Sequence, residues 1–139
     1  MARIYRYSNT GFEPQTQTHL IKKSNTTLEE LHAHCENDFQ KSLISLSFRK
    51  PDPDFEYSGV FVFLKYPSIG DRNFYLNHLE KTINKESIQF FETEIDDESI
   101  CYLDNGFVYH AENKTTIKDA LARGYETVYI PASQLKNIL

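Results

Sequence analysis

The spacing of apolar residues divides the chain into expected strands and helices. Residues 2–8 alternate apolar and polar side chains as a strand does, and residues 42–48 alternate in the same way. Residues 59–65 are apolar almost throughout, which is typical of a strand in the middle of a sheet. Further strands are expected at residues 87–95, 98–103, 107–108 and 126–130.

Helix signals separate these runs. Thr26 and Thr27 each stand three residues before a glutamate, which is the spacing of a capping box. A helix is therefore expected to begin here and to run to about residue 40. Its buried face would be formed by the apolar side chains at helical spacing, Leu28, Leu31, Cys35 and Phe39. Two more helices are expected, at residues 71–84 and 116–123.

A turn signal stands between two of the expected strands. Asp104-Asn105-Gly106 separates residues 102–103 from residues 107–108, and Asn-Gly supplies the positive φ angles that a tight hairpin needs. Taken together, the patterns predict an α+β fold in a single compact domain spanning residues 1–139. It should have six to eight mostly antiparallel, aromatic-rich strands and about three helices.

Composition narrows the classes of function. The chain has 139 residues, of which 40% are hydrophobic and 14% aromatic, so it can fold around a core without disulfides. Its net charge of −5 argues against general binding to duplex nucleic acid or anionic membranes, but it leaves room for a small anion held by arginines. No signal peptide or membrane span is seen, so cytoplasmic placement is expected. Cys35 and Cys101 are expected to be free thiols, with one disulfide as the alternative.

Several kinds of active site lack their motif. His32 and His34 on a helix would direct their rings about 200° apart, so the sequence predicts no zinc site. The chain has no Gly-x-Ser-x-Gly elbow, and its five scattered glycines form no phosphate loop.

Three short segments resemble a known family. Ile4-Tyr5-Arg6-Tyr7-Ser8 resembles the first strand of mono-ADP-ribosyltransferases of the cholera and pertussis toxin type. Ile44-Ser45-Leu46-Ser47 resembles their Ser-Thr-Ser strand, and the segment from Glu126 through Pro131 to Ile138 resembles their closing strand and tail. The order Arg, Ser, Glu along the chain is also the order in that family.

The resemblance implies an ADP-ribosyltransferase-like fold and NAD as the substrate. Arg6 would grip the cofactor, Ser45 and Ser47 would brace the site, and Glu126 would be catalytic. Ser45 would also contact the cofactor, and Tyr57 or Tyr66 would stack on nicotinamide. Such an enzyme would be a toxin, an effector or a phage-borne modifier that transfers ADP-ribose to a host protein or nucleic acid, and it could be delivered into a host cytosol.

The sequence also departs from the family. Leu46 replaces the middle Thr of Ser-Thr-Ser, and Gly124 stands where many members have Gln or Glu. Other interpretations of the same residues stay open. Arg6 could pair with an acid across the sheet, the two serines could form the exposed face of an edge strand, and Glu126 could be a solvated strand end.

A second hypothesis is a non-enzymatic interaction protein, such as an acidic inhibitor or immunity-type binder. Its basis is the two acidic segments at residues 52–56 and 92–98, because such patches steer binding to basic partners. A transferase fold with a dead site, used only for binding, would join the two hypotheses.

Overall fold

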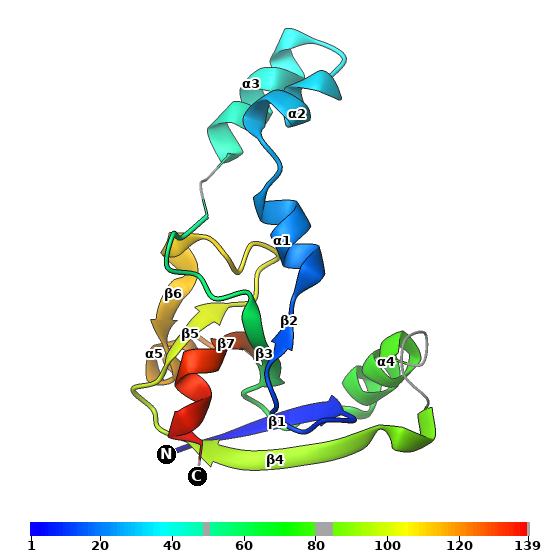
Figure 1. Ribbon diagram of the computed structural model, residues 1–139, viewed down its shortest axis with the longest axis vertical. Helices are drawn as coiled ribbons and strands as arrows, with labels where there is room; N and C mark the ends of the chain where they lie inside the picture. Colours follow the sequence, from blue (N-terminus) through cyan, green and yellow to red (C-terminus); the bar gives the residue numbers. More distant parts are fainter. Residues whose placement is uncertain (49–50, 80–84, 139) are drawn as a thin grey trace.

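The computed structural model describes residues 1–48, 51–79 and 85–138. They form an α+β structure around a seven-stranded sheet in which every pairing is antiparallel. The strand order is β4-β1-β3-β7-β5-β6, and β2 pairs with β3 (Figure 1). The strands are β1 (Ala2–Ser8), β2 (Gln15–Thr16), β3 (Ser58–Phe63), β4 (Gln89–Ile95), β5 (Ile100–Leu103), β6 (Lys114–Thr116) and β7 (Thr127–Pro131).

Strand β3 lies at the centre, as its apolar run predicts. One edge pairs with β7 along its length, and the other edge is shared, because β1 pairs at Phe63 and β2 pairs at Gly59 and Ser58. Gly59 is required here: a Cβ at this position would lie 2.4 Å from the carbonyl oxygen of Ile130 and 2.6 Å from the hydroxyl of Tyr129.

The core has two parts on opposite faces of the sheet. The aliphatic part packs beneath α5 (Ile117–Ala122) and the 3-10 helix η3 (Ala132–Asn137). It includes Ile4, Val60, Val62, Ile95, Leu103, Ile117, Val128 and Ile130. The aromatic part contains Leu20, Phe55, Tyr102, Val108, Tyr109 and Tyr129. The two parts follow from the period of two along β3, β5 and β7, where neighbouring residues face opposite sides.

Two helices border the flank of the sheet where β1 and β2 meet β3. Helix α1 (Thr18–Ser24) follows β2 and contributes Leu20 to the aromatic core. Helix α4 (Ile69–Leu79) packs on the sheet through Tyr75, whose ring lies 4.9 Å from that of Phe63.

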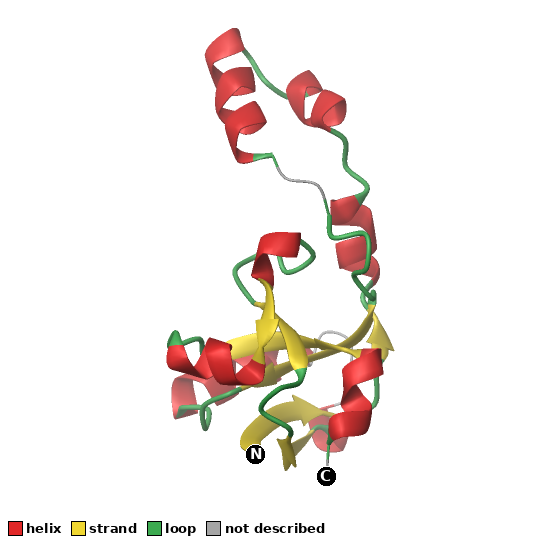
Figure 2. Ribbon diagram, turned by 90° about the vertical axis from the view of Figure 1, so that its left-hand side faces the viewer, coloured by secondary structure: helices red, strands yellow, loops and turns green. Residues whose placement is uncertain are grey.

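A helical arm extends from this sheet body. We call residues 25–48 the arm; it contains α2 (Leu28–Ala33) and α3 (Asp38–Ser47). Figures 1 and 2 show it projecting beyond α1, away from every strand. Neither arm helix buries a residue, so the arm is an appendage of the core.

Much of the expected arrangement is present. β1 spans residues 2–8, the central strand is β3, and an antiparallel sheet of seven strands falls within the expected range. Thr27 and Thr116 cap their helices by accepting hydrogen bonds from the backbone N–H groups of Glu30 and Asp119. The expected helix at residues 71–84 corresponds to α4, although residues 80–84 lie outside the described part of the chain.

Several expectations were wrong. The helix face expected to be buried, formed by Leu28, Leu31, Cys35 and Phe39, is not, because neither α2 nor α3 buries a residue and Phe39 is exposed. Residues 42–48 form no strand, because α3 covers Ser42 through Ser47. The single helix expected up to about residue 40 is divided into α2 and α3, since Asn37 begins a new helix by capping the N–H of Gln40. The Asn-Gly turn makes no tight hairpin: β5 pairs with β6 across a loop of residues 104–113.

More helices are present than the three expected, because α1 and the division of the arm were not foreseen. Among the described residues, no helix has the length and apolar character needed to cross a membrane.

Candidate functional site

Glu126, the expected catalytic carboxylate, stands just before β7 at the rim of a hollow. Its side chain is 63% exposed, with Oε1 3.8 Å from Nζ of Lys65. The backbone N–H of Leu64 donates to the Glu126 carbonyl oxygen at 2.8 Å and holds this position beside the end of β3. The hollow measures about 230 Å³, and its other lining residues are Phe63, Tyr66, Ser68 and Asp71.

Arg6 lies where β1 and β2 leave an unpaired stretch of the β3 edge. Its half-buried guanidinium donates to the carbonyl oxygen of Gly11 at 2.5 Å, and burial lowers the pKa of Arg6. Arg6 is among the residues that line a second hollow of about 330 Å³, between α1 and α4. Its other lining residues are Tyr7, Gln15, Gln17, His19, Phe61, Val62, Phe63, Tyr75, His78 and Leu79.

A third hollow, of about 400 Å³, adjoins both of these. It shares Tyr7 with the Arg6 hollow, and it shares Tyr66 and Ser68 with the Glu126 hollow. The Arg6 and Glu126 hollows also share Phe63. We call the three together the α4 cleft, because α4 contributes residues to each.

The α4 cleft combines cationic and aromatic side chains. Arg72 carries a guanidinium group, whose planar donors match phosphate oxygens, and Lys65 adds an ammonium group beside Glu126. Arg6 lines the second hollow, and its guanidinium donates to the Gly11 carbonyl oxygen. Tyr7 and Tyr75 are partly buried in the walls, and burial raises the pKa of both phenols, so both are neutral at pH 7. A ligand with phosphates and planar rings suits this lining.

Of the two tyrosines proposed to stack on nicotinamide, only Tyr66 lines the cleft. Its ring is 65% exposed and meets the rings of Tyr5 and Phe90 edge-on, at 5.4 and 5.5 Å. These edge contacts hold the ring at the hollows that Tyr66 lines. Tyr57 lies elsewhere: its hydroxyl donates to Oγ of Ser24 at 2.8 Å, and its ring packs on Phe55.

Ser45 and Ser47 are not in the α4 cleft, which corrects the expectation that they brace Glu126. Both lie on α3 of the arm and donate to backbone carbonyl oxygens of their own helix, at Lys41 and Ile44. Ser45 also forms a hydrogen bond with Nε2 of His32. The strand that would have aligned them with the sheet does not exist, so the structure brings Arg6, Tyr66 and Glu126 to one cleft and leaves the serines outside.

Sequence reasoning missed three cleft residues, Lys65, Ser68 and Arg72. Ser68 supplies a hydroxyl to the same hollow as Glu126, and it also caps α4 by accepting from the N–H of Asp71. Arg72 lay within an expected helix, but the sequence offered no signal that this helix would pack against β1 and β3.

A separate cavity of about 310 Å³ lies where the arm joins the body. Its polar lining groups already have partners within the protein: Lys23 Nζ donates to the Gly106 carbonyl oxygen at 2.5 Å, and Ser47 and Ser24 bond their own helices. The other lining residues are Thr26, Leu31, Ile44, Phe48, Pro51, Phe107, Tyr109 and His110. This cavity offers few polar groups for recognising a ligand.

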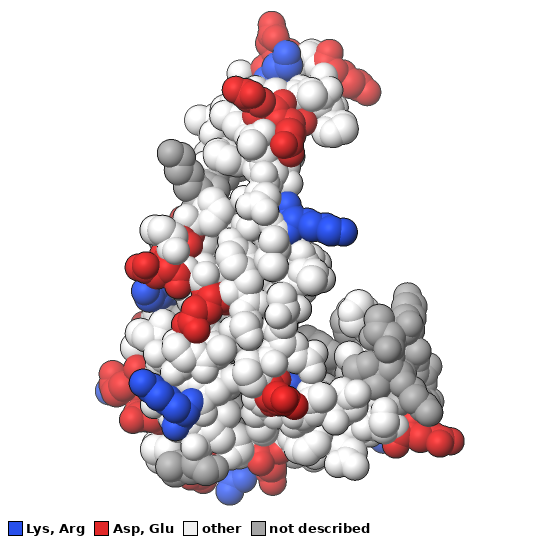
Figure 3. All heavy atoms as spheres, viewed as in Figure 1, with Lys and Arg blue, Asp and Glu red and all other residues white. Residues whose placement is uncertain are grey.

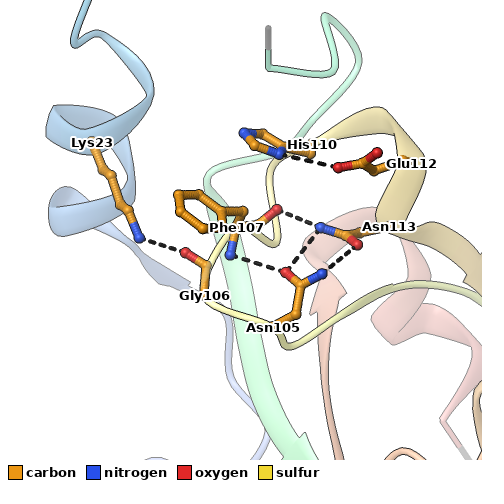
Figure 4. A network of polar contacts seen from close by, with 7 residues as sticks. All are labelled: Lys23, Asn105, Gly106, Phe107, His110, Glu112 and Asn113. Carbon is orange, nitrogen blue, oxygen red and sulfur yellow. Dashed lines mark hydrogen bonds and ion pairs between the residues drawn. The ribbon is translucent and has the colours of Figure 1, made fainter. Parts of the chain in front are cut away.

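The loop of residues 104–113 contacts α1 through Lys23 (Figure 4). The Phe107 ring lies between the Lys23 ammonium, 4.2 Å from its centroid, and the buried ring of His110, which stacks at 5.1 Å. The side-chain amides of Asn105 and Asn113 pair with each other and hold the loop open. The Asn105 side chain also accepts a hydrogen bond from the N–H of Phe107. These contacts explain why Asn105-Gly106 forms part of a wide loop here and not a tight hairpin turn.

The two acidic segments are partly engaged within the protein. Asp52 is buried and accepts a hydrogen bond from the Tyr102 hydroxyl at 2.7 Å, while Glu56 accepts from the N–H and hydroxyl of Ser133. In β4 the two glutamates at positions 92 and 94 lie 3.6 and 3.7 Å from Arg3. Each segment therefore has part of its carboxylates engaged within the protein, while Asp54 and Glu98 are exposed.

Comparison with known proteins gives no relative. No family model, no curated protein and no solved structure matches the chain. Within the described residues, no three His, Cys, Asp or Glu side chains gather as metal ligands would.

Proposed function

We propose that the protein is an NAD-dependent mono-ADP-ribosyltransferase whose substrate binds in the α4 cleft. The observation that carries the proposal is that Arg6, Tyr66 and Glu126 line adjoining hollows of one cleft, although they stand far apart in the sequence. The resemblance in sequence named Arg6 and Glu126 independently of any packing, and Tyr66 was one of two tyrosine candidates chosen by position. An acceptor in a host protein or nucleic acid completes the proposed reaction.

The cleft residues suit the steps of that reaction. Arg6 and Arg72 would hold the pyrophosphate of NAD, and Tyr66 would stack on the nicotinamide ring. The bond between nicotinamide and C1′ of the ribose breaks, and its electron pair leaves with nicotinamide. The carboxylate of Glu126 would stabilise the positive charge that develops on the ribose. The acceptor then forms a bond to C1′ and loses its proton.

The supporting residues differ from those the resemblance implied. Ser45 and Ser47 cannot orient Glu126 from the arm. Lys65 forms an ion pair with the Glu126 carboxylate at 3.8 Å, and Ser68 supplies a hydroxyl to the same hollow. In this proposal Lys65 orients Glu126.

The proposal is tested by NAD binding and nicotinamide release. We expect millimolar NAD to raise the melting temperature, because a ligand that binds only the folded state stabilises it. Glu126→Gln should bind NAD but release nicotinamide about 100-fold more slowly, since it removes charge stabilisation in the transition state. Arg72→Ala should weaken NAD binding.

A matched control separates the cleft from general charge effects. Glu98→Gln removes an exposed carboxylate from the turn between β4 and β5, outside the cleft, and should change neither quantity. Full nicotinamide release by folded Glu126→Gln would remove the catalytic assignment. Absence of any NAD-dependent shift in melting temperature would contradict the proposal that the protein binds NAD.

A further inference from the structure

The arm exposes a stripe of large apolar side chains. Phe39, Leu43 and Leu46 follow one another at i, i+4 and i+7 along α3, so they lie on one face of the helix. Their exposed fractions are 72%, 51% and 73%. Exposure of three large side chains in one row indicates an interaction surface.

A groove adjoins this stripe. It measures about 330 Å³ and runs between α2 and α3, and Leu43 belongs both to it and to the stripe. Its other lining residues are Leu31, His34, Cys35, Gln40 and Ile44. An apolar groove with a row of anchors beside it is the form of surface that receives an amphipathic helix.

The charge of the arm determines which helix would fit. Residues 25–48 contain four carboxylates, at Glu29, Glu30, Glu36 and Asp38, against one lysine, which gives a net charge of −3 out of −5 for the chain. Figure 3 shows these acidic side chains around the end of the arm. A basic partner would be attracted, whereas nucleic acid or an anionic lipid surface would be repelled.

We propose that the arm is a docking surface for a basic amphipathic helix of a partner protein. The apolar face of that helix fills the groove and covers Phe39 and Leu46, and its lysines or arginines face the acidic rim. A second copy of this chain fits poorly, because two arms of charge −3 would face each other. This surface lies apart from the α4 cleft and serves binding whether or not the cleft is catalytic.

The test uses a fluorescent helical peptide of leucine and lysine, titrated with the full chain and followed by anisotropy. A second peptide carries glutamate at every lysine position. We expect the basic peptide to bind and the acidic one to fail. Because anchor residues dominate such interfaces, Phe39→Ser and Leu46→Ser should each weaken binding by about tenfold. Raised salt should also weaken it.

Leu121→Ser is the matched control, because Leu121 is an exposed leucine on a helix of the body, at 43% exposure. It should bind the basic peptide as the unmodified chain does, and circular dichroism checks that each variant is folded. Equal binding of both peptides, or equal affinity in the arm variants and the control, would overturn the proposal. So would sedimentation of the chain as a dimer that Leu46→Ser dissociates, because a second copy would then cover this surface.

Discussion

At the scale of single residues, the two cysteines have opposite environments. Both are free thiols, as expected. Cys101 is fully buried in β5, and burial, helped by the nearby Asp119 carboxylate, raises the pKa of its thiol to about 12. Cys35 is partly exposed on the arm, where its Sγ donates to the Leu31 carbonyl oxygen. Access therefore favours reaction at Cys35, and the raised pKa of Cys101 disfavours thiolate formation there.

The native protein should thus show one reactive thiol per chain. At pH 8 a thiol of pKa about 12 is roughly one part in ten thousand thiolate, and only the thiolate attacks a disulfide reagent. We expect Cys35 to react within minutes with a chromogenic disulfide, and Cys101 to react only after denaturant is added. Cys35→Ser is the control, and it should abolish the native reaction. Two rapidly reacting thiols in the folded protein would contradict the buried position of Cys101.

At the scale of elements, Asp52 ties the loop before β3 to β5. Its carboxylate accepts hydrogen bonds from the Tyr102 hydroxyl and from the N–H of Asp54, at 2.7 and 3.0 Å. Burial alone would raise the pKa of Asp52. These two hydrogen bonds, with the charge of Lys114, outweigh burial and hold the pKa below its ordinary value of 3.8.

Tyr102→Phe should therefore destabilise the fold in a pH-dependent way. The variant keeps the ring but removes one donor to a buried carboxylate, and we expect a loss of about 1–3 kcal/mol in the free energy of unfolding at pH 7. The folded pKa of Asp52 lies below the unfolded pKa, so its contribution is present above pH 3.8 and is lost as the pH falls through the folded value. Urea titrations at several pH values measure this.

Tyr125→Phe is the control for that series, because it removes a hydroxyl from a half-buried tyrosine between α5 and β7. It should show a small effect that does not depend on acid. A difference between Tyr102→Phe and the unmodified chain that stayed constant down to pH 3 would show that Asp52 is not the group concerned.

The same scale separates what the sequence could predict from what it could not. Strands β1, β3 and β7 follow from alternation or from an unbroken apolar run, and both signals are local. Residues 42–48 satisfy two periods at once: the serines alternate with apolar residues, but Phe39, Leu43 and Leu46 repeat at helical spacing. The N-cap at Asn37 favours the helix, and because these residues are helical, the two serines are not part of the sheet.

The residues of the candidate site also fall into those that the sequence could predict and those that it could not. Arg6 and Glu126 could be named from the sequence, because each stands on or beside a strand whose position was predictable. Tyr66 was a candidate by position alone. Arg72 and Lys65 could not be named, since their roles depend on α4 folding back over β1 and β3, a packing that leaves no local signal. Burial and pairing across the sheet, not spacing along the chain, bring these groups together.

At the scale of the whole molecule, the body and the arm differ in how they are held. Strands β3 and β7 are buried at most positions and pair along five residues. Helices α2 and α3 bury no residue, and helices this short are marginal without tertiary packing. The arm should therefore open locally at a much lower free energy than the sheet.

Hydrogen exchange measured by mass spectrometry tests this difference and separates the two proposed surfaces. We expect peptides from the arm to exchange at least about 100-fold faster than peptides from β3 and β7, because local opening suffices for the arm and global unfolding is needed for the sheet. Adding NAD should slow exchange in β1 and α4 and leave the arm unchanged. Adding the basic peptide should slow exchange in α2 and α3 alone. Protection of the arm by NAD would mean that the cleft and the arm form one coupled site. Exchange in the arm as slow as that in β3 would contradict the conclusion that the arm is an appendage that opens on its own.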